Sequence, residues 1–307
     1  MNAIQRQIVR DHQRQTGTHD SPQIFRGEPG DPGLIGPGSL SWEIHSDIAA
    51  ITIGGIGAIV MEILHPSVMA GVQDQSSYRE DPLRRGRTTF GYVVTTTFGN
   101  TAAATRLINA VKSMHARVNG TRPDGVAYEA LDPELIGWVH TCIPWAVMTA
   151  FERYNRPLSV AEKDMYLREQ AVIGRMSGAG DDIPETAADL EDYVEAMRPK
   201  LAVNGQTREF FEFLLTMPFG VPPLGPLSRP AHQFQAEMGM GLMPQWARRM
   251  TGFESSRFER RYVHTPLLHS YARTLRWAYD GLPPFAALAF ERALGASAVG
   301  APELVAV

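Results

Sequence analysis

Histidine and arginine side chains carry the clearest chemical signal in this sequence. His115 lies four residues after Val111 and three before Val118, so in a helix its imidazole shares the apolar face. A neutral imidazole in that position would either bind a metal or haem iron, or form a hydrogen bond to a backbone carbonyl or a neighbouring side chain in the core. The spacing alone leaves both interpretations open.

A second group is formed by Arg84, Arg87 and Thr88, which are spaced at i, i+3 and i+4 in the segment YREDPLRRGRTT. In a helix these three residues share one face. The segment lies between two very apolar stretches, and arginine keeps its charge on burial, so the face predicts an anionic or oxygen-rich partner. A solvated charged surface is the alternative.

Other familiar sites find less support. Glu62 and His65 match the Glu-x-x-His element of carboxylate di-iron bundles, but such a site needs two elements and the sequence has one. A helix that ends at His65, before Pro66, is the alternative. The sequence has no HExxH, GxSxG or Walker motif, and the glycines of GGIGAIV lack the spacing of a dinucleotide fingerprint. Cys142 is the single cysteine, which excludes an internal disulfide, and we expect a small core residue there.

The elements that must position these residues are predicted to be helices. Residues 100–119 have apolar positions at helical spacing and are followed by Gly120. A second helix is expected over 133–154; it carries His140, and Pro144 is a point where it can kink. The segment 91–99, GYVVTTTFG, has strand propensity, but the surrounding pattern favours a helix.

The apolar stretch 48–61 (IAAITIGGIGAIVM) is shorter than the ~20 residues that cross a bilayer. It is therefore predicted to be a buried helix, with glycines that let another helix or a flat ligand approach closely. A face that lies on a membrane surface is the alternative.

Capping boxes and helix-ending residues complete the fold prediction. Ser159 with Glu162, and Thr186 with Asp189, each indicate the start of a helix. Further helices are expected near 207–216, 231–250, 256–279 and 284–294. We therefore predict an all-α fold. It comprises one helical domain over 39–295, an irregular N-terminal arm over 1–38 and a C-terminal tail over 296–307.

Composition narrows the class of partner. The 307 residues are 44% hydrophobic, enough for one substantial core, and the net charge of −4 provides no basic field for nucleic acid. Partners are expected to be neutral or small, and the oligomeric state is left open. The first residues contain no apolar run of signal-peptide length, so a cytoplasmic location is expected.

Taken together, the motifs resemble a family of haem-dependent oxygenases typified by the bacterial latex-clearing protein, a rubber oxygenase, and the fungal MpaB oxygenase. The resemblance spans most of residues 36–280. Its segments are GPGSLSWEIHSD, ILHPSVMAGV, DPLRRGRTTF, KSMHARVNG, YEALDPELIGWVH and GLMPQWARRMTGF.

The resemblance implies a globin-like helical core that binds haem b, with His115 as the proximal iron ligand. His140, in GWVH, is the rival ligand and typifies the MpaB-like branch. Arg84, Arg87 and Thr88 match the distal polar cluster, which in rubber oxygenases is Arg-x-x-Lys-Thr, so Arg87 replaces a lysine.

Residues that flank the proximal histidine also match. Rubber oxygenases carry arginine at the positions of Lys112 and Asn119, so the resemblance places Lys112 beside the haem, while Asn119 lacks the charge. Their distal glutamate has no counterpart here in the matching register; Glu62 is nearby in sequence but out of register.

The implied activity is oxidative cleavage of a carbon–carbon double bond in an apolar, isoprenoid or lipid-like olefin by dioxygen. The distal cluster would stabilise negative charge on bound oxygen. A non-catalytic helical protein that carries haem or lipid is the alternative from another class. A third hypothesis is a fold that has lost haem and binds only a partner or a membrane surface, and peripheral membrane contact stays open.

Overall fold

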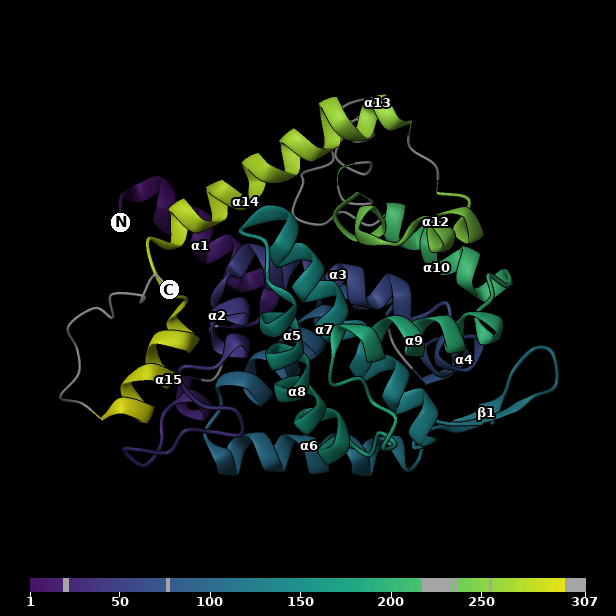
Figure 1. The fold of residues 1–307 in the computed structure, drawn as a ribbon, viewed down its shortest axis with the longest axis horizontal. Helices are drawn as coiled ribbons and strands as arrows, with labels where there is room; N and C mark the ends of the chain where they lie inside the picture. Colours follow the sequence, from purple (N-terminus) through teal and green to yellow (C-terminus); the bar gives the residue numbers. More distant parts are fainter. Residues whose placement is uncertain (19–21, 76–77, 217–233, 235–236, 254–255, 296–307) are drawn as a thin grey trace.

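The computed structural model describes residues 1–18, 22–75, 78–216, 234, 237–253 and 256–295, and these are mostly helical (Figure 1). The α-helices are α1 Ala3–Thr16, α2 Leu40–Ser46, α3 Ile48–Glu62, α4 Pro66–Gln75, α5 Pro82–Phe98, α6 Thr101–His115, α7 Pro133–Tyr154, α8 Val160–Ser177, α9 Ala187–Met197, α10 Gly205–Thr216, α12 Gln245–Thr251, α13 Arg257–Glu259, α14 Thr265–Tyr279 and α15 Pro284–Leu294. Shorter elements are the 3₁₀ helices η1 Pro22–Phe25, η2 Arg198–Lys200 and η4 Met240–Leu242, the π-helical segment η5 Arg260–His264, and the strands β1 Asn119–Thr121 and β2 Ala127–Glu129. The predicted all-α class is confirmed.

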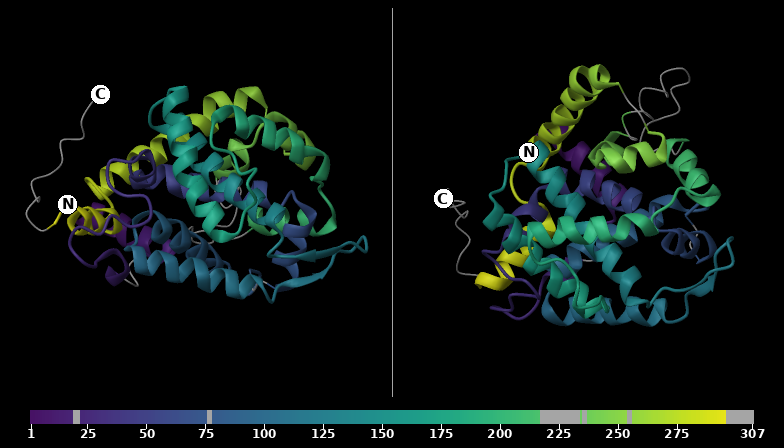
Figure 2. Two further views of the ribbon diagram at one scale, coloured as in Figure 1. Left: turned by 60° about the horizontal axis from the view of Figure 1, so that its bottom comes forward. Right: turned by 45° about the vertical axis from the view of Figure 1, so that its right-hand side comes forward.

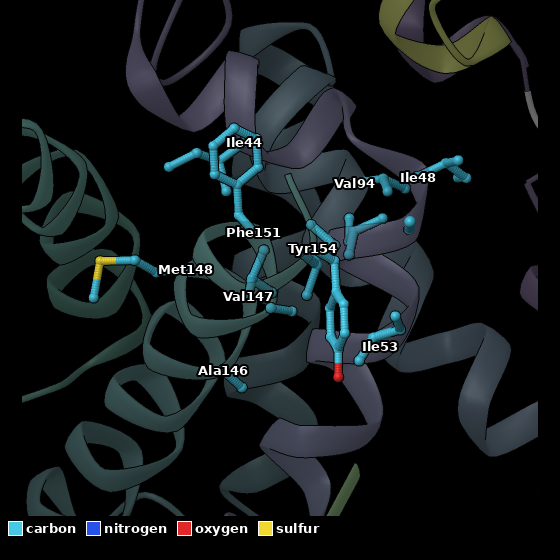
Figure 3. Close-up of a cluster of buried hydrophobic side chains, with 14 of the residues drawn as sticks. Ile44, Ile48, Ile53, Val94, Ala146, Val147, Met148, Phe151 and Tyr154 are labelled. Carbon is cyan, nitrogen blue, oxygen red and sulfur yellow. The ribbon is translucent and has the colours of Figure 1, made fainter. Parts of the chain in front are cut away.

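Two apolar helices, α3 and α7, pack against each other in the core (Figure 3). Glycines of α3 permit this close approach. A Cβ on Gly54 would lie 2.5 Å from the Cα of Val147, and a Cβ on Gly57 would lie 2.7 Å from Cδ1 of Leu242, whereas one on Gly55 would meet nothing within 4 Å. The predicted buried helix, closely approached by another, is therefore present.

The apolar helix α3 was also considered as a membrane-spanning segment. No single helix among the described residues is long and apolar enough to span a bilayer. The pair α2 and α3 reaches the required length and composition only together, and the two helices are bent by 91° at the break between them.

Side-chain caps start several helices where the sequence predicts them. Ser159 and Glu162 form a reciprocal capping box at the start of α8, and Thr186 and Asp189 form another at α9. Asn100 caps α6, which ends at His115. The segment 91–99 is helical as predicted and forms the last part of α5.

The N-terminal arm differs from the prediction of irregular chain over 1–38, because residues 3–16 form α1. Asn2 and Gln5 make a reciprocal capping box at its start. The Gln5 amide also donates to the carbonyl of Trp277 at 2.8 Å, which docks α1 on α14. Helix α1 carries few apolar side chains, but its buried residues recur at helical spacing: Gln5, Val9, His12 and Thr16. The prediction of an irregular arm missed this amphipathic pattern.

The rest of the arm is irregular beyond η1, as expected, and is held by one buried arginine. Arg292 of α15 is 4% exposed and donates to the carbonyls of Phe25 at 2.8 Å, Phe98 at 2.9 Å and Asp31 at 2.9 Å. These bonds join the arm, the end of α5 and α15.

A hairpin follows α6 and projects from the helical body (Figure 2). Its strands pair antiparallel, with Gly120 opposite Tyr128, and Gly125 takes a φ of 87° in the connecting turn. The all-α prediction did not include these two short strands. The tail over 296–307 and residues 231–233 and 235–236 lie outside the described residues. The single helix expected near 231–250 is wrong, because η4 Met240–Leu242 and α12 Gln245–Thr251 are separate elements with Pro244 between them.

Candidate functional site

A cavity of about 660 Å³ lies among α3, α4, α5, α6, the hairpin, α7 and the end of α8. Its volume falls within the range of sites that bind small organic ligands. Much of the wall is apolar, with contributions from Val111, Val118, Leu135, Ile136, Val139 and Ile143. The polar lining residues include those that the sequence marked as chemically interesting.

His115 and His140 both line this cavity, although they are on different helices. His115 is the last residue of α6, and His140 is two turns into α7, which starts at the Asp132 cap and Pro133. Among the described residues neither imidazole has a hydrogen-bond partner. The alternative for His115 was a core histidine whose ring bonds a backbone carbonyl. No such bond is present among the described residues.

Burial keeps both rings neutral near pH 7. It lowers the pKa of His140 to about 4, with a smaller contribution from the charge of His115. Burial also lowers the pKa of His115, and the guanidinium of Arg85 lowers it further. A neutral imidazole has a free lone pair, so either ring is in the form that binds a metal ion.

His140 is positioned by contacts on two sides. The ring of Tyr92 meets it edge-on, with 5.9 Å between ring centroids and 66° between planes. The Tyr92 hydroxyl bonds the Ser177 hydroxyl at 2.8 Å, which in turn donates to the carbonyl of Ile173. On the other side, α8 approaches so closely that a Cβ on Gly174 would lie 3.3 Å from the Cβ of His140.

The structure divides the predicted arginine cluster. Arg84 and Thr88 line the cavity together with Arg85 and Thr89, which the sequence prediction did not include. Arg87 does not line it: its Nε donates to the carbonyl of Arg14 on α1 at 2.7 Å. The physical reason is that α1 covers the flank of α5 that carries Arg87.

Two further predicted residues have bonding partners of their own. The Thr88 hydroxyl donates to the carbonyl of Arg84 at 2.9 Å, so its proton is already engaged. Lys112 is not among the residues that line the cavity, and its Nζ donates to the carbonyl of Met176 at 3.3 Å. Lys112 therefore joins α6 to the end of α8 beside the cavity.

Glu62 is the polar residue of the cavity that the motif search left without a role. Its side chain is buried, and Oε1 has no hydrogen-bond partner among the described residues. Burial raises the pKa of Glu62 to about 7, although the charge of Arg85 acts in the opposite direction. A carboxyl in this state can hold or release a proton near neutrality. The available signal was its place at the end of a wholly apolar helix.

A di-iron interpretation of Glu62 and His65 finds no support in this geometry. His65 is not a lining residue, and its Nε2 lies 4.0 Å from Oε1 of Glu134. No three His, Cys, Asp or Glu side chains in the described part of the chain come together as a metal site. Cys142 is buried, and burial raises the pKa of its thiol well above the usual range, which fits the predicted core role.

The elements around this cavity lie within a region that matches a known protein family. Residues 42–277, which include every element around the cavity, match the family described as ER-bound oxygenase mpaB/B'/rubber oxygenase, catalytic domain. Uncharacterised proteins of Mycobacterium tuberculosis and Mycobacterium bovis are each 26% identical over 181 residues, which cover 57% of this chain and 71% of theirs. No solved structure gives a significant match. The chain belongs to the MpaB and rubber oxygenase catalytic-domain family.

Proposed function

We propose that the protein is a haem b-dependent oxygenase that acts on an apolar, isoprenoid or lipid-like olefin and cleaves its double bond oxidatively. The observation that carries the proposal is the pair of neutral imidazoles without hydrogen-bond partners, His115 and His140, in one cavity of a chain that belongs to an oxygenase family.

The residues around the cavity fit a haem. Haem iron needs only one or two axial side chains, because the porphyrin supplies the remaining donors. His115 would hold the haem iron, and His140 is the second candidate. The apolar side chains of α6 and α7 suit the faces of a porphyrin, and guanidinium groups on α5 suit its carboxylates.

When bound, haem would supply the iron that activates dioxygen. The chain's own groups have separate tasks. Arg84 presents positive charge to the cavity, where it would stabilise negative charge that develops on oxygen. The carboxyl of Glu62 would hold or release a proton at Oε1. Val139 and Ile143 exclude water and provide an apolar surface for an olefin.

A haem titration tests the ligand assignment. The purified protein is titrated with haemin and followed by its Soret band, alongside His115→Ala and His140→Ala, with His269→Ala as a control because His269 lies outside the cavity. Wild type and control should bind one haem, whereas His115→Ala should bind at least ~10-fold more weakly and recover when imidazole is added. Wild-type spectra from both cavity variants would overturn the assignment.

Turnover separates the oxygenase from a carrier. The haem-loaded protein is mixed with squalene, oxygen uptake is recorded, and carbonyl products are sought by mass spectrometry. Oxygen uptake with two carbonyl fragments per cleaved bond supports the oxygenase. Haem loading with no product from squalene or from an unsaturated fatty acid would favour the carrier instead.

A further inference from the structure

The cavity has cationic groups at its rim. Arg84 and Arg85 of α5 and Arg117, just beyond α6, all line it and are all exposed, whereas Leu135 and Ile136 on the same wall are buried. The cavity is thus charged where it meets solvent and apolar deeper in. This excess of positive charge is local, because the chain as a whole has a net charge of −4.

Two of these guanidinium groups lack a partner. Within the described residues, Arg85 and Arg117 form no side-chain hydrogen bond or ion pair. Arginines elsewhere on the described surface are of both kinds: Arg79 bonds Glu209 at 2.7 Å, whereas Arg106 and Arg168 are exposed without such a bond. Arg85 and Arg117 differ from Arg106 and Arg168 because they line the cavity. A guanidinium presents several N–H donors in a plane, and their geometry matches a carboxylate. Guanidinium groups without a partner beside an apolar cavity therefore indicate a ligand with an anionic group.

The only carboxyl among the lining residues that the structure describes does not fill that role. Glu62 is buried at the end of α3, whereas Arg117 is exposed beyond α6. The charge of Arg85 acts on Glu62 and also on His115, so this guanidinium lies within electrostatic range of both. Arg84 has its own ion-pair partner, Asp81, with Nε 3.9 Å from Oδ2, so one carboxyl near the interior leaves Arg85 and Arg117 as the rim cations in excess.

We propose that the cavity binds an apolar molecule through its carboxylate, which pairs with Arg85 and Arg117 at the rim while the carbon chain lies against α6 and α7. This inference rests on the proposed function, because it makes the substrate an unsaturated carboxylic acid rather than a neutral olefin. The carboxylate can come from the substrate or from the propionates of a bound haem. The chemistry at the arginines is the same in both cases.

Binding of one chain length with three head groups tests this inference. The probes are cis-9-hexadecenoate, its methyl ester and the corresponding alcohol, titrated calorimetrically into apoprotein and haem-loaded protein below their aggregation limits. The acid should bind at least ~10-fold more tightly than the ester or alcohol, and added salt should reduce the difference. Equal binding of acid and ester, together with equal binding of haemin and its dimethyl ester, overturns the inference.

Matched arginine variants locate the contact. Arg85→Gln and Arg117→Gln should each weaken binding of the acid by ~10-fold or more and leave the ester unchanged. Arg106→Gln is the control, because Arg106 is exposed on α6 but does not line the cavity. Circular dichroism establishes that each variant is folded. Wild-type affinity for the acid and for haemin in both cavity variants would overturn the proposal.

Haemin and its dimethyl ester then separate the two sources of carboxylate. Weaker binding of haemin, but not of the dimethyl ester, in Arg85→Gln and Arg117→Gln assigns the arginines to the propionates. Weaker binding of the fatty acid to the haem-loaded variants assigns them to the substrate. Acid-selective binding without oxygen uptake would contradict the proposed function and support this inference. Oxygenase activity on squalene with no preference for the acid would support the proposed function and contradict this inference.

Discussion

Gly174 of α8 lies directly against His140 of α7. A Cβ on the glycine would lie 3.3 Å from the Cβ of His140 and would also overlap the end of the Ile183 side chain. Because Tyr92 holds the ring edge-on from α5, His140 is confined between two helices. The direction in which its imidazole faces the cavity is therefore set by the packing of α8 as well as by α7 itself.

Gly174→Ala should disturb this arrangement. The added methyl group must displace Ile183 or His140, and overpacking of this kind costs about 1–3 kcal/mol of unfolding free energy. Urea unfolding measures the loss, and the Soret band of the haem-loaded variant reports on His140. Gly91→Ala is the control, because a Cβ there meets nothing within 4 Å. Equal stability of the two variants would contradict the assigned contact.

The glycines of α3 allow a comparison within one helix. Gly54→Ala places a methyl group against the backbone of Val147, which cannot move aside like a side chain, so a loss of about 3 kcal/mol or more is expected. Gly55→Ala meets open space and should be neutral or stabilise by about 0.5–1 kcal/mol, because alanine favours helix. Thermal and urea unfolding of the pair would show whether α3 and α7 pack as described.

How far the sequence predicts this site depends on the residue. His115 could be placed because Val111 lies one turn before it on the same face of α6. The helix expected over 100–119 ends at His115, so Val118 lies beyond it. The face of α5 could not be chosen in the same way, since Arg84 and Thr88 belong both to a stripe with Arg87 and to a stripe with Arg85. The choice is made by α1, which covers Arg87 and which was predicted to be irregular chain.

Glu62 shows a second limit. Its residue type and position at the end of an apolar helix were visible, but an unpaired carboxyl in a cavity depends on what other helices bring near it. Here α5 supplies Arg85 within electrostatic range, and no described side chain bonds Oε1. Such a relationship arises only in the packed structure. The helix starts at Ser159 and Thr186 depend on local capping bonds, and these were predicted correctly.

Arg87→Gln should affect stability rather than the cavity. The change removes the bond from Arg87 Nε to the carbonyl of Arg14, which joins α5 to α1. A loss of about 0.5–1.5 kcal/mol of unfolding free energy is expected, as for an ordinary hydrogen bond. Haemin titration and binding of cis-9-hexadecenoate should equal wild type. A tenfold loss of either would place Arg87 in the site after all.

Acid should destabilise the protein through its buried histidines, which include two that are remote from the cavity, His12 and His45. Burial lowers the pKa of His12 to about 4 and that of His45 to about 3. Both values lie below the unfolded value of 6.5, so the unfolded chain takes up protons first as the pH falls, and stability is lost below pH 6.5. At pH 5 the loss is about 2 kcal/mol for each residue.

Urea unfolding at pH 5 and pH 7.5 measures this loss. His45 bonds the hydroxyls of Thr97 and Tyr166, each at 2.8 Å, and a glutamine at this position can keep one of them. His45→Gln should therefore be less stable than wild type at pH 7.5 but lose less stability on acidification. An unchanged difference between the two pH values would rule out His45 as a source of the acid sensitivity.

Glu62 predicts the opposite dependence on pH. Its folded pKa of about 7 lies above the ordinary glutamate value of 4.5. The carboxyl therefore stabilises the fold fully below pH 4.5, and this contribution is lost as the pH rises through 7. Arg85 on α5 opposes the shift, and the thiol of Cys142 on α7 is the neighbouring titratable group. Glu62→Gln carries no charge, so it should exceed wild type in stability at pH 8 by up to about 3 kcal/mol.

The advantage of Glu62→Gln should shrink as the pH falls to 5, because the wild-type carboxyl is then protonated in the folded state. Urea unfolding of both proteins between pH 5 and pH 8 measures it. Glu191→Gln, an exposed change on α9, should show no such trend. If both variants follow wild type at every pH, the carboxyl of Glu62 is ionised throughout this range, and its assignment as the proton-holding group of the cavity fails with it.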